Sequence, residues 1–202
     1  MEAAMDDFIS ELNKVDIDFF KKIAKNLKKR QDDEQQLTSY EDMLNFAQRN
    51  LINLDKIALV GLAHMAYGWM PTMIKHTVLA SDFRGWKLKI KNGSLEKSFL
   101  KEIMKLTNES IVGASKLLHF LNPNDYPIYD SKVYSSIVNH DCKVNLSKDV
   151  ENYVKYAEKL RNLVKNTNQN DILDIQKKLF DKKYIPQKCT PIRVLEVCLY
   201  AK

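Results

Sequence analysis

Apolar side chains recur at spacings of three and four along most of this chain, which is the period of an amphipathic helix. The chain has only five glycines and five prolines, too few for the many tight turns of a β-sandwich or β-barrel. This pattern predicts an all-α protein. The helices expected from it span residues 3–30, 38–51, 57–73, 94–106, 111–121, 132–139, 146–164, 170–180 and 191–199.

Polar residues at expected helix starts support some of these boundaries. Thr38 and Glu41 have the spacing of a capping box, and Asp55 is placed to cap the helix that follows it. Thr190 followed by Pro191 is a strong start signal, because proline suits the first position of a helix. These signals predict three helix N-termini.

Two segments have less regular patterns. Residues 57–73 carry no Asp, Glu, Lys or Arg, and they approach the length of a short membrane span. Polar residues and Pro71 interrupt this run, so a buried core helix is the favoured interpretation and no membrane partner is expected. Residues 81–94 lose the helical period and contain an Asn-Gly turn signal, which predicts a loop or a short hairpin-like excursion.

Length and composition add limits on organisation and on partners. A chain of 202 residues can bury a sizeable core, and we expect a single domain with lobes near 1–93 and 94–202, with C-terminal helices packing back on the first lobe. The net charge of +6 suits a polyanionic partner without requiring one, because lysine-rich genomes also produce such a balance.

Cysteine usage and the N-terminal sequence point to a protein without a metal site or leader. The three cysteines lack CxxC spacing, so neither a disulfide framework nor a metal site is indicated, and no cofactor is expected. The acidic start MEAAMDDFISEL has no signal-peptide pattern, which favours a cytoplasmic location.

Lys116 occupies an unusual position on the expected helix 111–121. At about 100° per residue, apolar side chains cover most of the helix circumference, and Lys116 falls in the remaining gap. The gap either faces water, which makes Lys116 a surface lysine, or opens into a cleft where the lysine serves chemistry. The helical wheel alone favours the first interpretation.

The segment that follows this helix delivers an aspartate to the start of the next one. Asn122-Pro123 ends the helix, because the residue before proline avoids α geometry and proline cannot continue the hydrogen-bond ladder. Pro127 to Tyr129 is expected to be extended, which places Asp130 as N-cap of the helix over 132–139. Capping alone explains an aspartate at this position. We call residues 122–130 the elbow.

The stretch IVGASKLLHFLNPNDYPIYDSKV resembles a motif of the helix-hairpin-helix (HhH-GPD) DNA glycosylases. That superfamily includes the 8-oxoguanine, adenine-mismatch and endonuclease III-type enzymes. The shared order is a glycine, an apolar helix, a short loop, Pro-Ile-x-Asp and a new helix. The variant is most similar to a divergent bacterial branch of the 8-oxoguanine-glycosylase-like fold, sometimes found in antiphage operons. The first hairpin glycine of the family is absent here, and Lys116 stands one position after the usual lysine, at which Ser115 would align.

The resemblance implies a fold, a reaction and roles for particular residues. It implies a two-lobed helical glycosylase fold, double-stranded DNA with a flipped nucleotide as partner, and cleavage of an N-glycosidic bond, with an oxidised purine as one candidate base. Lys116 would be the Schiff-base nucleophile and Asp130 the catalytic carboxylate. The residues expected to contact nucleic acid are Gly113, Ser115, Arg84, Lys87 and Lys132. The residues expected to line a pocket for the flipped base are Tyr67, Trp69, Trp86 and His119.

Two other interpretations remain open at this point. A helical module that binds nucleic acid or protein could keep the glycosylase scaffold after losing its chemistry, and the degenerate hairpin favours this. An ordinary all-α interaction protein could also contain such an elbow by chance. Trp69 and His119 are more often core residues than ligands, and surface lysines are more often simply solvated.

Overall fold

The computed structural model describes residues 2–30, 34–69, 73–74, 83, 85–142 and 144–202, with side chains from residue 7 except those of residues 34–38. The described residues are all-helical and contain no strand, which confirms the predicted fold class. No helix among them is both long enough and apolar enough to cross a membrane. The elements are α1 (Glu2–Lys14), α2 (Ile17–Asn26), α3 (Glu34–Ile52), α4 (Lys56–Gly68), α5 (Trp86–Lys91), α6 (Lys97–Lys105), α7 (Ile111–Leu121), α8 (Ser131–Val138), the 3-10 turn η1 (Leu146–Lys148), α9 (Val150–Asn166), α10 (Gln169–Asp181) and α11 (Pro191–Ala201).

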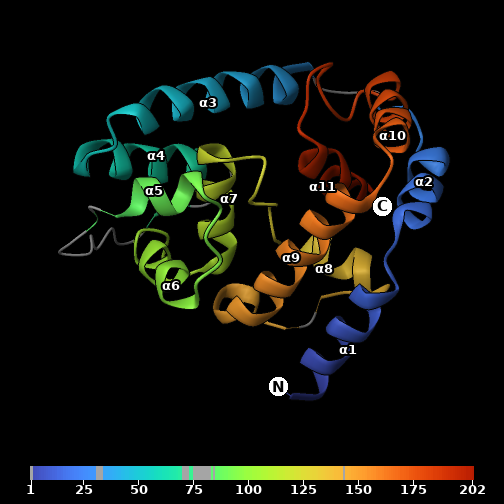
Figure 1. The fold of residues 1–202 in the computed structure, drawn as a ribbon, viewed down its shortest axis with the longest axis horizontal. Coiled ribbons are helices and arrows are strands. Elements are labelled where there is room, and N and C mark those ends of the chain that lie inside the picture. Colours follow the sequence, from blue (N-terminus) through green and yellow to red (C-terminus); the bar gives the residue numbers. More distant parts are fainter. Residues whose placement is uncertain (1, 31–33, 70–72, 75–82, 84, 143) are drawn as a thin grey trace.

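The helices gather into two groups on either side of α7 and α9 (Figure 1). In one group, α3, α4 and α6 each pack against α7. In the other, α1 packs against α8 and α9, while α2 packs against α10 and α11. Contacts of α6 with α9, and of α7 with η1, join the groups. The N-terminal helices α1 and α2 therefore pack with C-terminal helices, across the lobe boundary expected near residue 93.

Several predicted boundaries are confirmed by the caps. Asp55 accepts a hydrogen bond from the Ala58 N–H at 2.7 Å at the start of α4. Thr190 caps α11 with Pro191 in its first turn. Helix α7 spans 111–121 as predicted.

Three sequence predictions are corrected. The single helix expected over 3–30 is broken at Asp16, whose side chain caps α2 by accepting from the Phe19 N–H at 2.9 Å. The break lets α1 and α2 bury their apolar faces against different helices. The helix expected to begin at Thr38 begins at Glu34, since Glu and Gln are good helix formers and extend it toward the N-terminus. The expected loop near residue 90 contains α5, whose Trp86 and Ile90 bury one face at i, i+4 spacing.

Gly113 of α7 lies against Tyr67 of α4. A Cβ atom at this position would lie 2.5 Å from the Tyr67 Oη and 2.9 Å from the Thr107 Cβ. Tyr67 and Thr107 are both buried, and the Tyr67 hydroxyl donates to the Thr107 carbonyl at 2.7 Å. The absence of a side chain at Gly113 therefore permits the packing of α4 on α7.

We expect Gly113→Ala to destabilise the protein by about 1–3 kcal/mol, because overpacking of a filled core outweighs the better helix propensity of alanine. Chemical denaturation measures the change in the free energy of unfolding. The matched control is Gly61→Ala in α4, where an added Cβ meets nothing within 4 Å. The control should stabilise the protein by roughly 0.5–1 kcal/mol. Equal effects of the two substitutions would contradict the packing role of Gly113.

Candidate active site

The structure brings Lys116 and Asp130 together. The Lys116 Nζ lies 3.8 Å from the Asp130 Oδ2, and the two side chains are only 12% and 14% exposed. At this separation the two groups form an ion pair that is longer than a hydrogen bond. The gap in the apolar circumference of α7 therefore faces Asp130, and Lys116 does not lie on open surface.

Burial lowers the pKa of Lys116, and the positive charge of Arg193 adds to this effect. The negative charges of Asp130 and Glu196 act in the opposite direction and favour the ammonium form. Because burial is the largest influence, the neutral amine is more accessible than it would be for a surface lysine. A neutral amine is the form that acts as a nucleophile.

The two carboxylate oxygens of Asp130 have different surroundings. Its Oδ1 accepts hydrogen bonds from the backbone N–H groups of Lys132 and Val133, each at 3.1 Å. These bonds confirm the predicted N-cap of α8. Its Oδ2 is the atom that lies near Lys116. One oxygen thus anchors the carboxylate to the helix while the other remains directed at the amine.

Ser115 fixes the elbow to the helix that carries Lys116. Its Oγ accepts from the Tyr129 N–H at 3.1 Å and donates to the Val112 carbonyl at 2.9 Å. Because Ser115 precedes Lys116 and Tyr129 precedes Asp130, this bond joins the immediate neighbours of both groups. Ser115 is fully buried, and its expected role in nucleic-acid binding stays a prediction.

His119 ties a second point of the elbow to α7. Its Nδ1 lies 2.8 Å from the Tyr126 carbonyl oxygen, which can only accept, so the proton is on Nδ1. The unprotonated Nε2 then accepts from the Tyr40 hydroxyl at 2.8 Å. Burial, together with the positive charge of Arg193, lowers the pKa of His119 to about 3. The imidazole is therefore neutral at physiological pH, and its ring is enclosed in the interior.

The other aromatic residues expected in a base pocket have three different surroundings. Trp69 is half-buried at the end of α4, where its ring contacts Phe120 and lies 5.7 Å from the Arg193 guanidinium. Tyr67 is buried against Thr107, and Trp86 is buried edge-to-face against Phe99. Trp69 is thus the member of this set that shares Arg193 with Lys116 as a neighbour.

The residues expected to contact nucleic acid are likewise spread over the molecule. The Gly113 N–H donates to the Ser110 Oγ at 3.4 Å within the cap of α7. Lys87 donates to the Ile52 carbonyl, and the exposed Lys132 places its Nζ 4.3 Å from the Tyr200 ring centroid. Arg84 lies outside the described residues. Lys132 lies in the turn that Asp130 caps and is the predicted nucleic-acid contact nearest to Asp130 in sequence.

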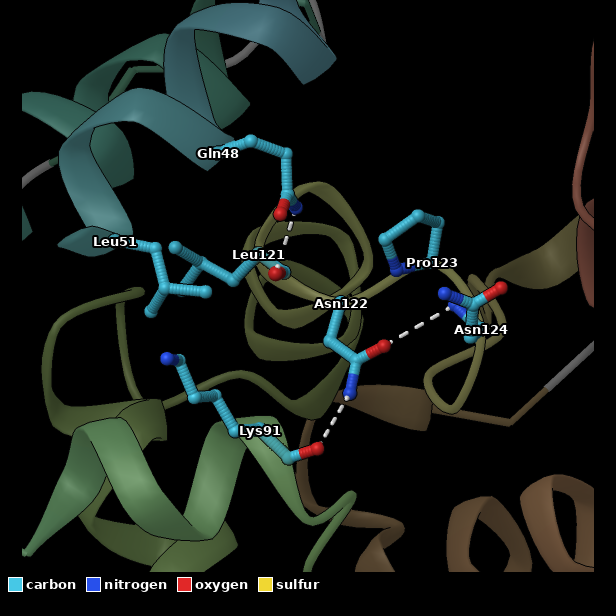
Figure 2. A pocket seen from close by; sticks show the side chains of 7 residues that line it. All are labelled: Gln48, Leu51, Lys91, Leu121, Asn122, Pro123 and Asn124. Carbon is cyan, nitrogen blue, oxygen red and sulfur yellow. Dashed lines mark hydrogen bonds between the residues drawn. The ribbon is translucent and has the colours of Figure 1, made fainter.

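A pocket of about 210 Å³ lies at the far end of α7 and is not lined by Lys116 or Asp130 (Figure 2). Its residues are Gln48, Leu51, Lys91, Leu121, Asn122, Pro123 and Asn124. The Gln48 amide donates to the Phe120 and Leu121 carbonyls at 3.0 and 2.8 Å, and the Asn122 amide donates to the Ile90 carbonyl at 2.9 Å. The Gln48 amide satisfies two carbonyl groups at the C-terminal end of α7 and joins that end to α3. The Asn122 amide joins it to α5.

Sequence reasoning missed Arg193 and Glu196 of α11. Glu196 is buried and Arg193 is partly buried, and they form an ion pair with each other beside His119 and Lys116. The sequence does carry a signal, because Glu196 is the one carboxylate in the run PIRVLEVCLYA, which is mostly apolar, and Arg193 precedes it by three positions.

Comparisons with family models, with curated proteins and with solved structures gave no match to this chain.

Proposed function

We propose that this protein is a DNA N-glycosylase with lyase activity, in which Lys116 is the nucleophile and Asp130 the assisting carboxylate. The observation that supports this most strongly is the largely buried pair, with the Lys116 Nζ 3.8 Å from the Asp130 Oδ2. The lowered pKa of Lys116 is what an amine nucleophile requires. The proposed partner is duplex DNA with a flipped nucleotide, and an oxidised purine is the proposed class of base.

The proposed reaction begins with attack of the neutral Lys116 amine on the anomeric carbon of the flipped nucleotide. The N-glycosidic bond breaks, and the base leaves with its bonding electrons and takes up a proton. The attacking nitrogen then loses one proton, the bond between C1′ and the ring oxygen breaks, the ring oxygen takes up a proton, and a protonated Schiff base remains. Loss of a proton from C2′ then permits elimination of the 3′ phosphate. The Asp130 carboxylate would stabilise positive charge on the sugar in the first step and accept a proton afterwards.

Reductive trapping tests this proposal. The full chain is incubated with duplex oligonucleotides that hold an abasic site, 8-oxoguanine or other damaged bases, and borohydride is added. We expect a covalent protein–DNA adduct with at least one of these duplexes, because reduction of the Schiff base makes the linkage permanent. Undamaged duplex and samples without borohydride are the controls. Absence of both adduct and base release across the panel would favour a non-catalytic binding module on this scaffold.

A further inference from the structure

Glu196 is a buried carboxylate with a partner for each of its oxygens. It is 1% exposed within α11. Its Oε1 pairs with the Arg193 guanidinium one turn earlier. Its Oε2 accepts from the Ile128 N–H at 2.9 Å and lies 3.5 Å from the His119 Nδ1. Burying a carboxylate costs free energy, so we expect the Glu196 carboxylate to have a role at this position.

The hydrogen bond to Ile128 completes a series of ties along the elbow. His119 holds the Tyr126 carbonyl, Glu196 holds the Ile128 N–H and Ser115 holds the Tyr129 N–H. Two of these ties come from α7, the helix that carries Lys116. The tie from Glu196 comes from α11, and it fixes the backbone two residues before Asp130.

Glu196 also acts on Lys116 through its charge. Burial raises the pKa of Glu196 to about 7, against the opposing influence of Arg193 and of the Ile128 N–H. Above that pH, its negative charge favours the ammonium form of Lys116. Among the described residues, further titratable groups that interact electrostatically with Glu196 are Asp130, Tyr40, Tyr153, Tyr156 and Cys189, in addition to Arg193, Lys116 and the neutral His119.

We propose that Glu196 is a positioning residue for the Lys116–Asp130 pair, holding the elbow through the Ile128 N–H and placing a buried negative charge beside Lys116. This proposal rests on the proposed function for its effect on the reaction, whereas its geometric part concerns the folded protein alone. Arg193 balances the charge of Glu196 and keeps it in place. Arg193 and Glu196 together therefore set the position of Asp130 and the pH at which Lys116 loses its proton.

Two substitutions separate the two roles of Glu196. Glu196→Asp keeps the charge and the pairing with Arg193, but its shorter side chain moves away from the Ile128 N–H. Glu196→Gln keeps an oxygen that can accept from the Ile128 N–H but removes the charge. Glu158→Gln is the matched control, since it removes a carboxylate that is about half exposed on α9. If Glu196→Gln does not fold because Arg193 is left unpaired, Glu196→Asp still tests the hold on the elbow.

The first readouts need no activity. Amide hydrogen exchange at Ile128 should become roughly tenfold faster in Glu196→Asp than in the wild type, because the hydrogen bond is lost. The titration of Lys116, followed by NMR of ¹³Cε-labelled lysine, should move to lower pH in Glu196→Gln, because a charge that favours the ammonium form is gone. Unchanged Ile128 exchange in folded Glu196→Asp, together with an unchanged Lys116 titration in folded Glu196→Gln, would overturn the proposal.

The trapping reaction supplies the catalytic readout. For Glu196→Asp we expect the rate of adduct formation to fall roughly 10- to 100-fold with unchanged affinity for the DNA, since misplacement of reacting groups costs rate more than binding. For Glu196→Gln we expect the rise of the trapping rate with pH to shift to lower pH. If the wild type forms no adduct, the proposed function fails while the exchange and titration results still decide whether Glu196 positions the pair.

Discussion

Replacing Lys116 with alanine is expected to abolish the borohydride-trapped adduct completely. A Schiff base needs a primary amine at the reacting carbon, and we assign that role to the largely buried amine beside Asp130. Lys116→Met should give the same loss, because methionine fills similar space without an amine. Gel analysis of the reduced reaction measures the adduct. Thermal unfolding of both variants checks that the loss does not come from misfolding.

The control for this prediction is Lys105→Ala, which removes an exposed lysine of α6 that pairs with Glu102. It should form the adduct at the wild-type rate. An adduct of undiminished yield in folded Lys116→Ala would remove Lys116 from the mechanism, whatever activity the protein then had. Retained binding of damaged DNA by Lys116→Ala, with the adduct lost, would support a direct chemical role for the amine.

Asp130→Asn is expected to lower the rate of base release by roughly 10²- to 10⁴-fold, the range found when positioned acid–base groups are removed. Asparagine is as good an N-cap as aspartate, so its oxygen can accept from the Lys132 and Val133 N–H groups as the Asp130 Oδ1 does. What changes is the atom facing Lys116, where a carboxylate oxygen becomes an amide nitrogen. Single-turnover assays on duplex DNA measure the effect.

The matched control is Asp55→Asn, which alters the N-cap aspartate of α4 in the same way, at an aspartate for which no lysine partner is seen among the described residues. The free energy of unfolding of each variant should lie within about 1 kcal/mol of the wild-type value. Equal rates of base release for Asp130→Asn and the wild type would show that Asp130 has only its capping role. A large loss of stability in Asp130→Asn alone would mean that its ion pair with Lys116 supports the fold.

Local rules predicted the parts of the site that local sequence determines. Helix period gave α7, proline placed its end, and capping placed Asp130 at the start of α8. These rules operate over a few residues, so they could not place Lys116 against Asp130 in space. The direction in which the gap on α7 faces depends on packing between helices that are distant in the sequence.

Other features of the structure depend on contacts between distant parts of the chain or on very short elements, so local patterns do not predict them. The break at Asp16 depends on the packing of α1 and α2 against different helices. The apolar period of the sequence continues through Asp16, so it does not indicate this break. Helix α5, which buries Trp86 and Ile90, is too short to show the helical period in its sequence. Glu196 contacts the elbow across 68 positions of sequence, so only the tertiary structure shows that it acts there.

The tie between α11 and the elbow has a consequence for the order in which the protein is made. A nascent chain that has emerged from the ribosome as far as α8 already contains Lys116 and Asp130, but lacks Arg193 and Glu196. Synthesis proceeds at about 5–20 residues per second, so the remaining helices follow several seconds later. Until α11 docks, the Ile128 N–H lacks its hydrogen bond to Glu196, and Lys116 lacks the nearby charges of Arg193 and Glu196. The surroundings of Lys116 are thus completed only after α11 has been synthesised, and chains that end before α11 are expected not to form the trapped adduct.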